Sequence, residues 1–157
     1  MGRIGPTSET LAVPCFALGR VPAVVTEPTA PDALPQTERT ALKRLPERGR
    51  FDRATIDAIL DEAVTCHLGF VHDAQPLVVP TIPARHGDSV YVHGAVASRM
   101  LRTIVDGPVC LTVTLLDGLV VARSGFHSSM NYRSVMLLGR VRLVETDEER
   151  ALALDAI

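Results

Sequence analysis

The chain has 157 residues, of which 46% are hydrophobic and 22% charged, and its formal net charge is −2. This size and composition predict one domain with a real hydrophobic core. Charges of both signs are interspersed, Trp is absent, and there are four Phe and two Tyr, so a basic or base-stacking nucleic-acid surface is excluded. Three scattered cysteines fit a reducing compartment. Because no apolar run is long enough to span a membrane, we expect a cytoplasmic protein without membrane partners.

Residues 1–44 differ from the rest of the chain. Six prolines fall between Pro6 and Pro35, and they interrupt any helix or central strand. We therefore predict a disordered or irregular Pro-rich tail over 1–44 and a folded domain over 45–157.

The first expected element of the domain is a helix over residues 55–64. Asp52 is a good N-cap for it. Apolar residues recur at helical spacing and would lie on one face, namely Ile56, Ile59, Leu60, Ala63 and Val64. This helix should pack on a sheet.

Short apolar or alternating segments separated by turn residues follow. They predict strands over 66–72, 77–84, 89–93, 109–116, 119–123 and 135–145, with turns at 73–74, 86–88 and 117–118 and a polar loop over 124–131. Pro80 and Pro83 make 77–84 an edge or bulged strand, because proline cannot donate to a ladder. Six such strands predict a mainly β fold, a closed antiparallel barrel with peripheral helices.

Two further helices are expected. Residues 98–105 form a short one that ends at 106–108. Asp147 caps another that is still running at Ile157. We therefore expect the C-terminal end of the domain to be incomplete.

Ser98 and Arg99 are the first candidate site. A hydroxyl, a guanidinium and a helix N-terminus at one point suit a phosphate. Arg102 lies one turn further on, and basic groups there oppose the helix dipole unless an anion is bound. The alternative is that both arginines are solvated residues of a helix whose apolar face is Met100, Leu101 and Ile104.

Two other places could address a flat polar ligand. His93 ends a strand before Gly94 and could hydrogen-bond a ligand or transfer a proton, although a histidine there is more often structural. Prolines in the segment Pro80–Pro83 leave backbone groups free for a heterocycle, or mark a barrel bulge.

Arg133 precedes an apolar strand, where its guanidinium needs an acceptor. No cluster has zinc or haem-iron spacing, so no metal site is predicted.

Residues 45–157 resemble the pyridoxamine 5'-phosphate oxidase-like FMN-binding split-barrel superfamily, above all its nitroimidazole-resistance-type flavin-nucleotide-binding branch. Three segments carry the resemblance: Cys66–Val71 with Pro76–Thr81, Tyr91–Gly94 running to Ser98 and Arg99, and Asn131–Val135 followed by Leu138–Arg140.

The resemblance implies a six-stranded antiparallel split β-barrel and a homodimer that binds FMN at the subunit interface. Ser98 and Arg99 would hold the phosphate. His93 and Gly94 would line the ribityl chain. Arg133 and Ser134 would contact the ring or phosphate, from either subunit. The ring would lie along the backbone of Val79, Pro80, Thr81 and Ile82.

Two departures from the family pattern matter. The oxidases commonly carry Ser-Arg-Lys where this chain has Ser98-Arg99-Met100, and their C-terminal substrate-binding region is missing. Oxidation of pyridoxamine phosphate is therefore not expected. The nitroimidazole-resistance proteins use a histidine near the position of His93, which makes His93 the candidate catalytic residue.

The leading hypothesis is an FMN-dependent oxidoreductase acting on a small molecule, with NAD(P)H as a possible electron donor. One alternative is a flavin-binding module without turnover, a store or a sensor. Another is a deazaflavin or haem bound to the same barrel.

Overall fold

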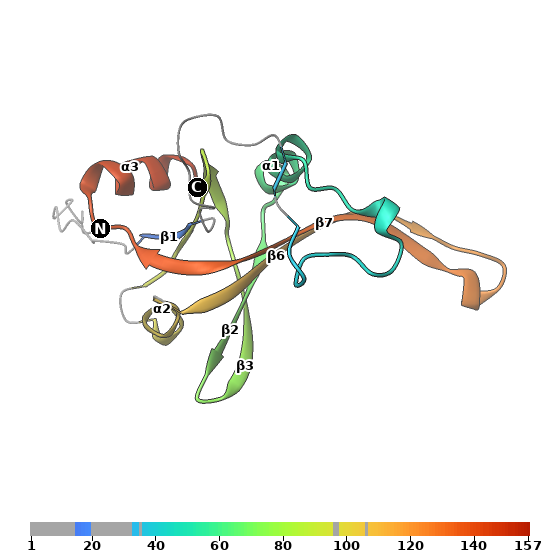
Figure 1. The fold of residues 1–157 in the computed structure, drawn as a ribbon, viewed down its shortest axis with the longest axis horizontal. Coiled ribbons are helices and arrows are strands. Elements are labelled where there is room, and N and C mark those ends of the chain that lie inside the picture. Colours follow the sequence, from blue (N-terminus) through green and yellow to red (C-terminus); the bar gives the residue numbers. More distant parts are fainter. Residues whose placement is uncertain (1–14, 20–32, 35, 96–97, 106) are drawn as a thin grey trace, which may run out of the picture.

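The computed structural model of the chain describes residues 15–19, 33–34, 36–95, 98–105 and 107–157 (Figure 1). Among these residues the fold is mainly β with few helices, as predicted. The strands are β1 (Cys15–Gly19), β2 (Cys66–His72), β3 (Gln75–Thr81), β4 (Ala84–His86), β5 (Ser89–His93), β6 (Pro108–Val120) and β7 (Ser129–Leu143). The helices are α1 (Arg53–Glu62), α2 (Arg99–Ile104) and α3 (Asp147–Asp155), with single 3₁₀ turns η1 (Pro46–Arg48) and η2 (Gly125–His127).

The described strands form one antiparallel sheet in the order β3-β2-β6-β7-β1-β5-β4. Its two edge strands, β3 and β4, are consecutive in the chain and separated by Ile82 and Pro83, so the sheet curls until its edges meet at this corner. No pairing between β3 and β4 is described, and Pro83 has no N–H to make one. The expected closed barrel is therefore not seen, and the described strands number seven rather than six.

One strand lies in the segment where an irregular tail was expected. β1 pairs with both β5 and β7, for example Phe16 with Val92 and with Leu143. Its five residues contain no proline, because Pro14 precedes the strand. The prolines that interrupt regular structure elsewhere in residues 1–44 therefore do not prevent a strand here. Residues 1–14 and 20–32 lie outside the described part of the chain.

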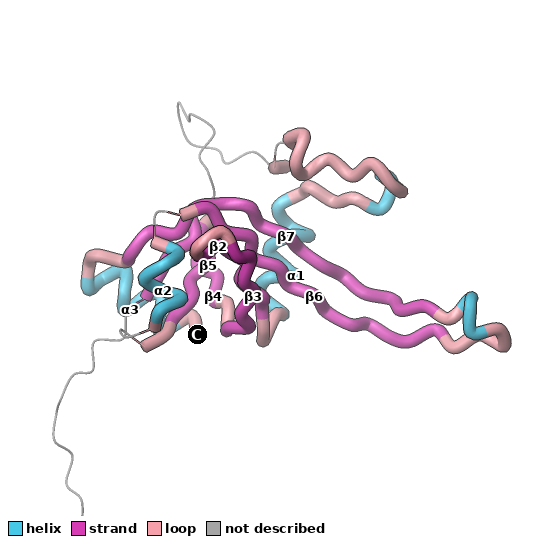
Figure 2. Tube along the Cα trace, turned by 90° about the horizontal axis from the view of Figure 1, so that it is seen from below, coloured by secondary structure: helices cyan, strands magenta, loops and turns pink. Residues whose placement is uncertain are grey.

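The predicted turn at Asp117 and Gly118 is wrong. β6 continues through these residues to Val120 and pairs with β7, which begins at Ser129 rather than at 135. A register shift between Leu116 and Gly118 marks a bulge, which takes up one extra residue without ending the strand. The result is a long hairpin, residues 116–132, that projects from the body and that we call the arm (Figures 1 and 2).

Other local predictions hold. Asp52 caps α1 and accepts a hydrogen bond from the Thr55 N–H at 2.9 Å. Turns lie at Asp73–Ala74 and at Gly87, all with positive φ. Some helix ends differ. α1 stops at Glu62, which leaves Val64 exposed. Thr146 rather than Asp147 is the N-cap of α3, which ends at Asp155 rather than running to Ile157.

The core fills the inner face of the sheet. Alternate residues of the strands point inward, and α1 and α2 add Ile59, Leu60, Leu101 and Ile104 to the same cluster. A second, smaller cluster lies where α3 packs on the sheet, and it joins Ala153 to Ala84, Tyr91 and Val144. None of the described helices is long and apolar enough to cross a membrane.

Candidate functional site

The proline-bearing strand β3 lies at an edge of the described sheet. Val79 packs against the core, whereas Pro80 and Ile82 are exposed. Proline fits an edge strand where its nitrogen faces away from the neighbouring strand. Pro76, Val78 and Pro80 are two residues apart, so their backbone groups face the same side, and we expect the N–H and C=O of Val78 to point outward. The outer edge then has the Val78 N–H as a hydrogen-bond donor and the carbonyls of these three residues as acceptors.

His93 and Gly94 lie at the end of β5. The Nδ1 atom of His93 is buried and has no hydrogen-bond partner among the described residues, and a buried polar atom of this kind needs an explanation. A Cβ at Gly94 would stand 2.9 Å from Cδ1 of Leu101. Leu101 is fully buried, so glycine is what lets α2 approach the strand end.

Ser98 is the N-cap of α2, so the helix begins one residue after its predicted start. Its Oγ accepts a long hydrogen bond, 3.5 Å, from the Leu101 N–H, and Arg99 is the first helical residue. The expected apolar face of the helix is confirmed, since Leu101 and Ile104 belong to the core and Met100 packs against it. Packing therefore fixes α2 at the strand end that carries His93.

Arg133 is engaged within its own chain. Its Nη1 and Nη2 donate to Oε2 and Oε1 of Glu62 at 2.8 and 2.9 Å, and Nη2 also donates to Oδ1 of Asp117 at 2.8 Å. These hydrogen bonds lower the pKa of both carboxyls and raise that of Arg133. The sequence indicated that Arg133 needs an acceptor; the acceptors found are two carboxylates, which sequence reasoning did not single out.

The two arginine-serine pairs lie at opposite ends of β2. In α2, the Thr103 hydroxyl lies 3.5 Å from Nδ1 of His72 at the end of β2. Ser134 pairs with Thr114, next to Val113, which faces Cys66 at the start of β2. Seven strand residues span roughly 20 Å, and Figure 1 likewise shows α2 and α1 at opposite ends. The structure therefore does not bring Ser98 and Arg133 together within one chain.

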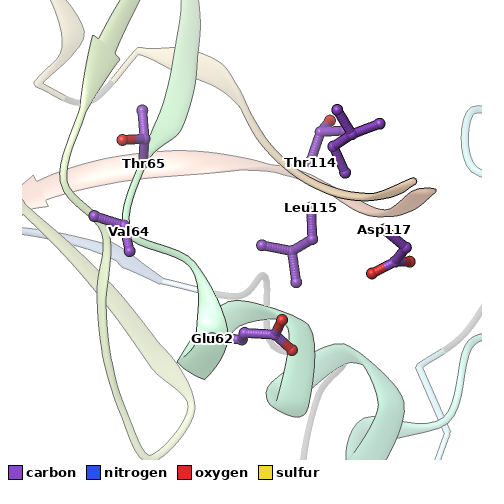
Figure 3. A pocket seen from close by; sticks show the side chains of 7 residues that line it. Glu62, Val64, Thr65, Thr114, Leu115 and Asp117 are labelled. Carbon is purple, nitrogen blue, oxygen red and sulfur yellow. The ribbon is translucent and has the colours of Figure 1, made fainter. Parts of the chain in front are cut away.

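Two shallow pockets flank the end of α1. The first, about 300 Å³, lies beside the carboxylates that bind Arg133 (Figure 3). It is lined by Glu62, Val64, Thr65, Thr114, Leu115, Leu116 and Asp117. The second, about 360 Å³, reaches Ile82 and Pro83 but also Asp61 and Glu62. Acidic groups at both pockets disfavour a phosphate, so neither is assigned as the cofactor site.

A family comparison matches the folded part of the chain. The model described as pyridoxamine 5'-phosphate oxidase matches residues 52–157. No curated protein matches the chain.

Three solved structures are similar to it. The flavocytochrome Anf3 from Azotobacter vinelandii is 43% identical (TM-score 0.69) over 76% of this chain. The FAD and heme binding protein from Mycobacterium smegmatis is 37% identical (0.63) over 68%. A protein of Bacteroides thetaiotaomicron VPI-5482 assigned to 5-nitroimidazole antibiotic resistance is 30% identical (0.54) over 68%. The chain spans 56%, 52% and 64% of their respective lengths.

Proposed function

Because the chain belongs to the pyridoxamine 5'-phosphate oxidase family, we propose that it binds a flavin nucleotide between the edge of β3 and the start of α2. The observation that carries this assignment is the buried, unpartnered Nδ1 of His93 beside Gly94. A polar ligand there would satisfy that atom. We further propose that the curled sheet is a split barrel whose edges meet at the corner between β3 and β4.

The predicted site residues other than Arg133 and Ser134 have roles in this proposal, and Val78 joins them. The outward N–H and C=O of Val78, with Val79 to Ile82, pair with the donor and acceptor edge of the ring. His93 hydrogen-bonds the cofactor, and Gly94 lets α2 pack close to the strand end that carries His93. Ser98 and Arg99 hold the phosphate. The flavin supplies electron transfer when bound, while these residues bind it, orient it and exclude water from one side.

Our first choice of cofactor is FMN, and the second candidate is FAD together with haem. That second candidate is favoured by two of the structures, at 43% and 37% identity, whose descriptions name a flavocytochrome and an FAD and heme binding protein. Both chains are longer than this one, so their cofactors come to this chain as proposals only.

Turnover is a further proposal. We favour an FMN-dependent oxidoreductase acting on a small molecule in the cytoplasm, with His93 as the candidate proton donor or acceptor and NAD(P)H as a possible reductant. The alternative is a flavin store or sensor. Rapid bleaching of the bound flavin by NADH or NADPH in the absence of oxygen favours the enzyme, and a flavin that stays oxidised favours the store.

The test is cofactor retention. Purified protein is mixed with FMN, FAD or haemin, passed through gel filtration and examined by visible absorbance. We expect a retained flavin spectrum that Arg99→Ala and Ser98→Ala weaken on the order of tenfold in affinity. Arg48→Ala, at an exposed arginine of η1, is the control. A protein that retains neither flavin contradicts the proposal, and a Soret band with haemin supports the second candidate.

A further inference from the structure

The most basic part of the chain lies outside the proposed flavin site. We call residues 36–50 the basic loop. Five of its fifteen residues are lysine or arginine and two are glutamate, so the loop carries a net charge of +3, whereas the whole chain carries −2. The rest of the chain is therefore net acidic. The family match begins at residue 52, so the basic loop also lies outside that match.

The cations of the basic loop face solvent. All five are exposed, namely Arg39, Lys43, Arg44, Arg48 and Arg50. In the part of the chain that the structure describes, none of the five takes part in an ion pair. Arg85 and Arg133 of the sheet, by contrast, each contact two carboxylates. The positive charge of the loop is therefore not neutralised by neighbouring side chains.

The basic loop has a defined shape. Its ends are held together, because the Leu34 N–H donates to the Phe51 carbonyl at 2.8 Å. Leu34 packs against the core, so this closure is fixed to the body. Inside the loop, a Cβ at Gly49 would stand 2.8 Å from Cδ1 of Leu42, which shows how closely the chain folds back on itself. The cations are thus carried by a closed, packed loop.

The basic loop stands out from an acidic body. Figures 1 and 2 show it extending from the body next to α1, outside the sheet. A molecule with charge separated in this way is oriented by the field of a charged partner as the two approach. A negative partner therefore meets the basic loop first, and the encounter is faster at low salt.

The composition of the basic loop narrows the class of partner. The loop contains no Phe, Tyr or Trp, so it lacks the aromatic side chains that stack on single-stranded nucleic acid or lie at a membrane interface. Four of its five cations are arginine, whose guanidinium binds a carboxylate through two hydrogen bonds. Leu42 and Leu45, on either side of Lys43 and Arg44, are 48% and 42% exposed. Arginines beside apolar side chains are typical of protein–protein contacts.

We propose that the basic loop is a docking site for an acidic segment of a partner protein. Carboxylates of that segment pair with Lys43, Arg44 and the other arginines of the loop, and its apolar side chains contact Leu42 and Leu45. Because fifteen residues offer a small area, the complex is transient and is held mainly by charge. Docking does not require a bound flavin.

The test is the binding of a fluorescein-labelled decapeptide of glutamate to the full chain without flavin, by fluorescence anisotropy in about 20 mM salt. We expect saturable binding that about 200 mM salt weakens on the order of tenfold. Lys43→Glu and Arg44→Glu should each weaken it about three- to tenfold. Arg123→Glu, at an exposed arginine of the arm, changes the net charge equally and is the matched control. Circular dichroism checks the fold of each variant, and Arg39→Glu replaces a loop variant that does not fold.

The same assay is run with a ten-nucleotide single strand and with vesicles that contain phosphatidylserine. Tighter binding of either than of the peptide overturns the assignment to a protein partner. An equal loss in Arg123→Glu, or no binding of the peptide at low salt, also overturns it. So does self-association that the loop variants abolish, since the acidic surface would then belong to this chain. Because flavin is absent throughout, failure of the flavin proposal cannot produce any of these results.

Discussion

The two halves of the sheet have the same alternation of side chains, but only one of them has its outer face covered by a helix. On the half formed by β4, β5 and β1, α3 covers the outer residues Ala84 and Tyr91, which are 3% and 4% exposed. On the half formed by β3, β2, β6 and β7, the outer residues Val78 and Met136 are more than half exposed. Apolar residues on both sides of a strand therefore indicate a second layer, but not whether the same chain supplies it.

Electrostatics follow the same division. Next to the covered half, Arg142 near the end of β7 donates to Glu149 on α3, and the Tyr91 hydroxyl on β5 donates to Glu149 at 3.1 Å. These bonds tie the covering helix to the sheet. On the other half, Arg133 ties the arm to α1 through Glu62 and Asp117. In both halves, hydrogen bonds and ion pairs therefore connect the sheet to a helix or to the arm, while apolar side chains make up the interior.

The largest effect is expected inside the sheet. Leu68 is fully buried and Val71, on the same strand β2, is mostly exposed. Leu68→Ala should lower the free energy of unfolding by about 2–5 kcal/mol, whereas Val71→Ala should change it by less than about 1 kcal/mol. Urea unfolding measures both losses. Equal losses would contradict the assignment of the two faces.

The second-largest effect on the free energy of unfolding is expected where α3 covers the sheet. Ala153 of α3 is fully buried against the sheet, so Ala153→Leu should overpack this layer and cost about 1–3 kcal/mol in the free energy of unfolding. Leu152→Ala, at a half-exposed neighbour, is the control and should cost less than about 1 kcal/mol. If Ala153→Leu is neutral by the same urea assay, α3 does not pack tightly on the sheet.

Substitutions in the hairpin turns of the two halves should change the melting temperature in opposite directions. Ala74, between β2 and β3, has φ 60°, and Gly87, between β4 and β5, has φ 57°. A side chain in this left-handed region costs about 1–2 kcal/mol. Ala74→Gly should therefore raise the melting temperature and Gly87→Ala should lower it, each by about 1 kcal/mol in stability. Shifts of the same sign would argue against the turn geometry.

Acid should loosen the arm before the body. Arg133 lowers the pKa of Glu62 and Asp117 below their ordinary values of 4.5 and 3.8. Their ion pairs therefore stabilise the fold fully above about pH 4.5, and the contribution is lost as pH falls through the lowered values. Arg133→Ala should mimic acid at neutral pH, with several-fold faster amide exchange in residues 116–132.

Arg140→Ala, elsewhere on β7, is the control for that experiment. Unchanged exchange in the arm of Arg133→Ala would show that the ion pairs do not hold it.

The smallest effect concerns the two described free cysteines. Burial raises the pKa of the Cys66 thiol to about 11, and Cys110 on β6 is half-buried. Below pH 9 the Cys66 thiol stays protonated and should react with iodoacetamide much more slowly than Cys110. Mass spectrometry of the labelled protein measures the two rates, and a faster reaction at Cys66 would contradict its burial.

Much of the fold could be read locally. Asp52, the turns at 73–74 and 86–88 and the apolar face of α2 are set by residues within a few positions of one another. The strand Cys15–Gly19 could not, because its partners β5 and β7 lie far away in the sequence. The bulge at Asp117 could not, because it depends on pairing with β7 across the hairpin. Asp117 and Gly118 are turn residues by type, and pairing with β7 overrides that preference.

The candidate site divides in the same way. Ser98 and Gly94 are recognisable because a helix start and a strand end are local features. The partners of Arg133 were missed, because Glu62 lies 71 residues away and no spacing rule connects them.

The most direct test of the flavin site is hydrogen exchange of the full chain with and without FMN, followed by peptide. The account predicts slower exchange in residues 77–82 and 93–101 when FMN is bound, with α3 unchanged as the internal reference. Protection confined to the acidic pockets beside α1, or no protection at all, would contradict it.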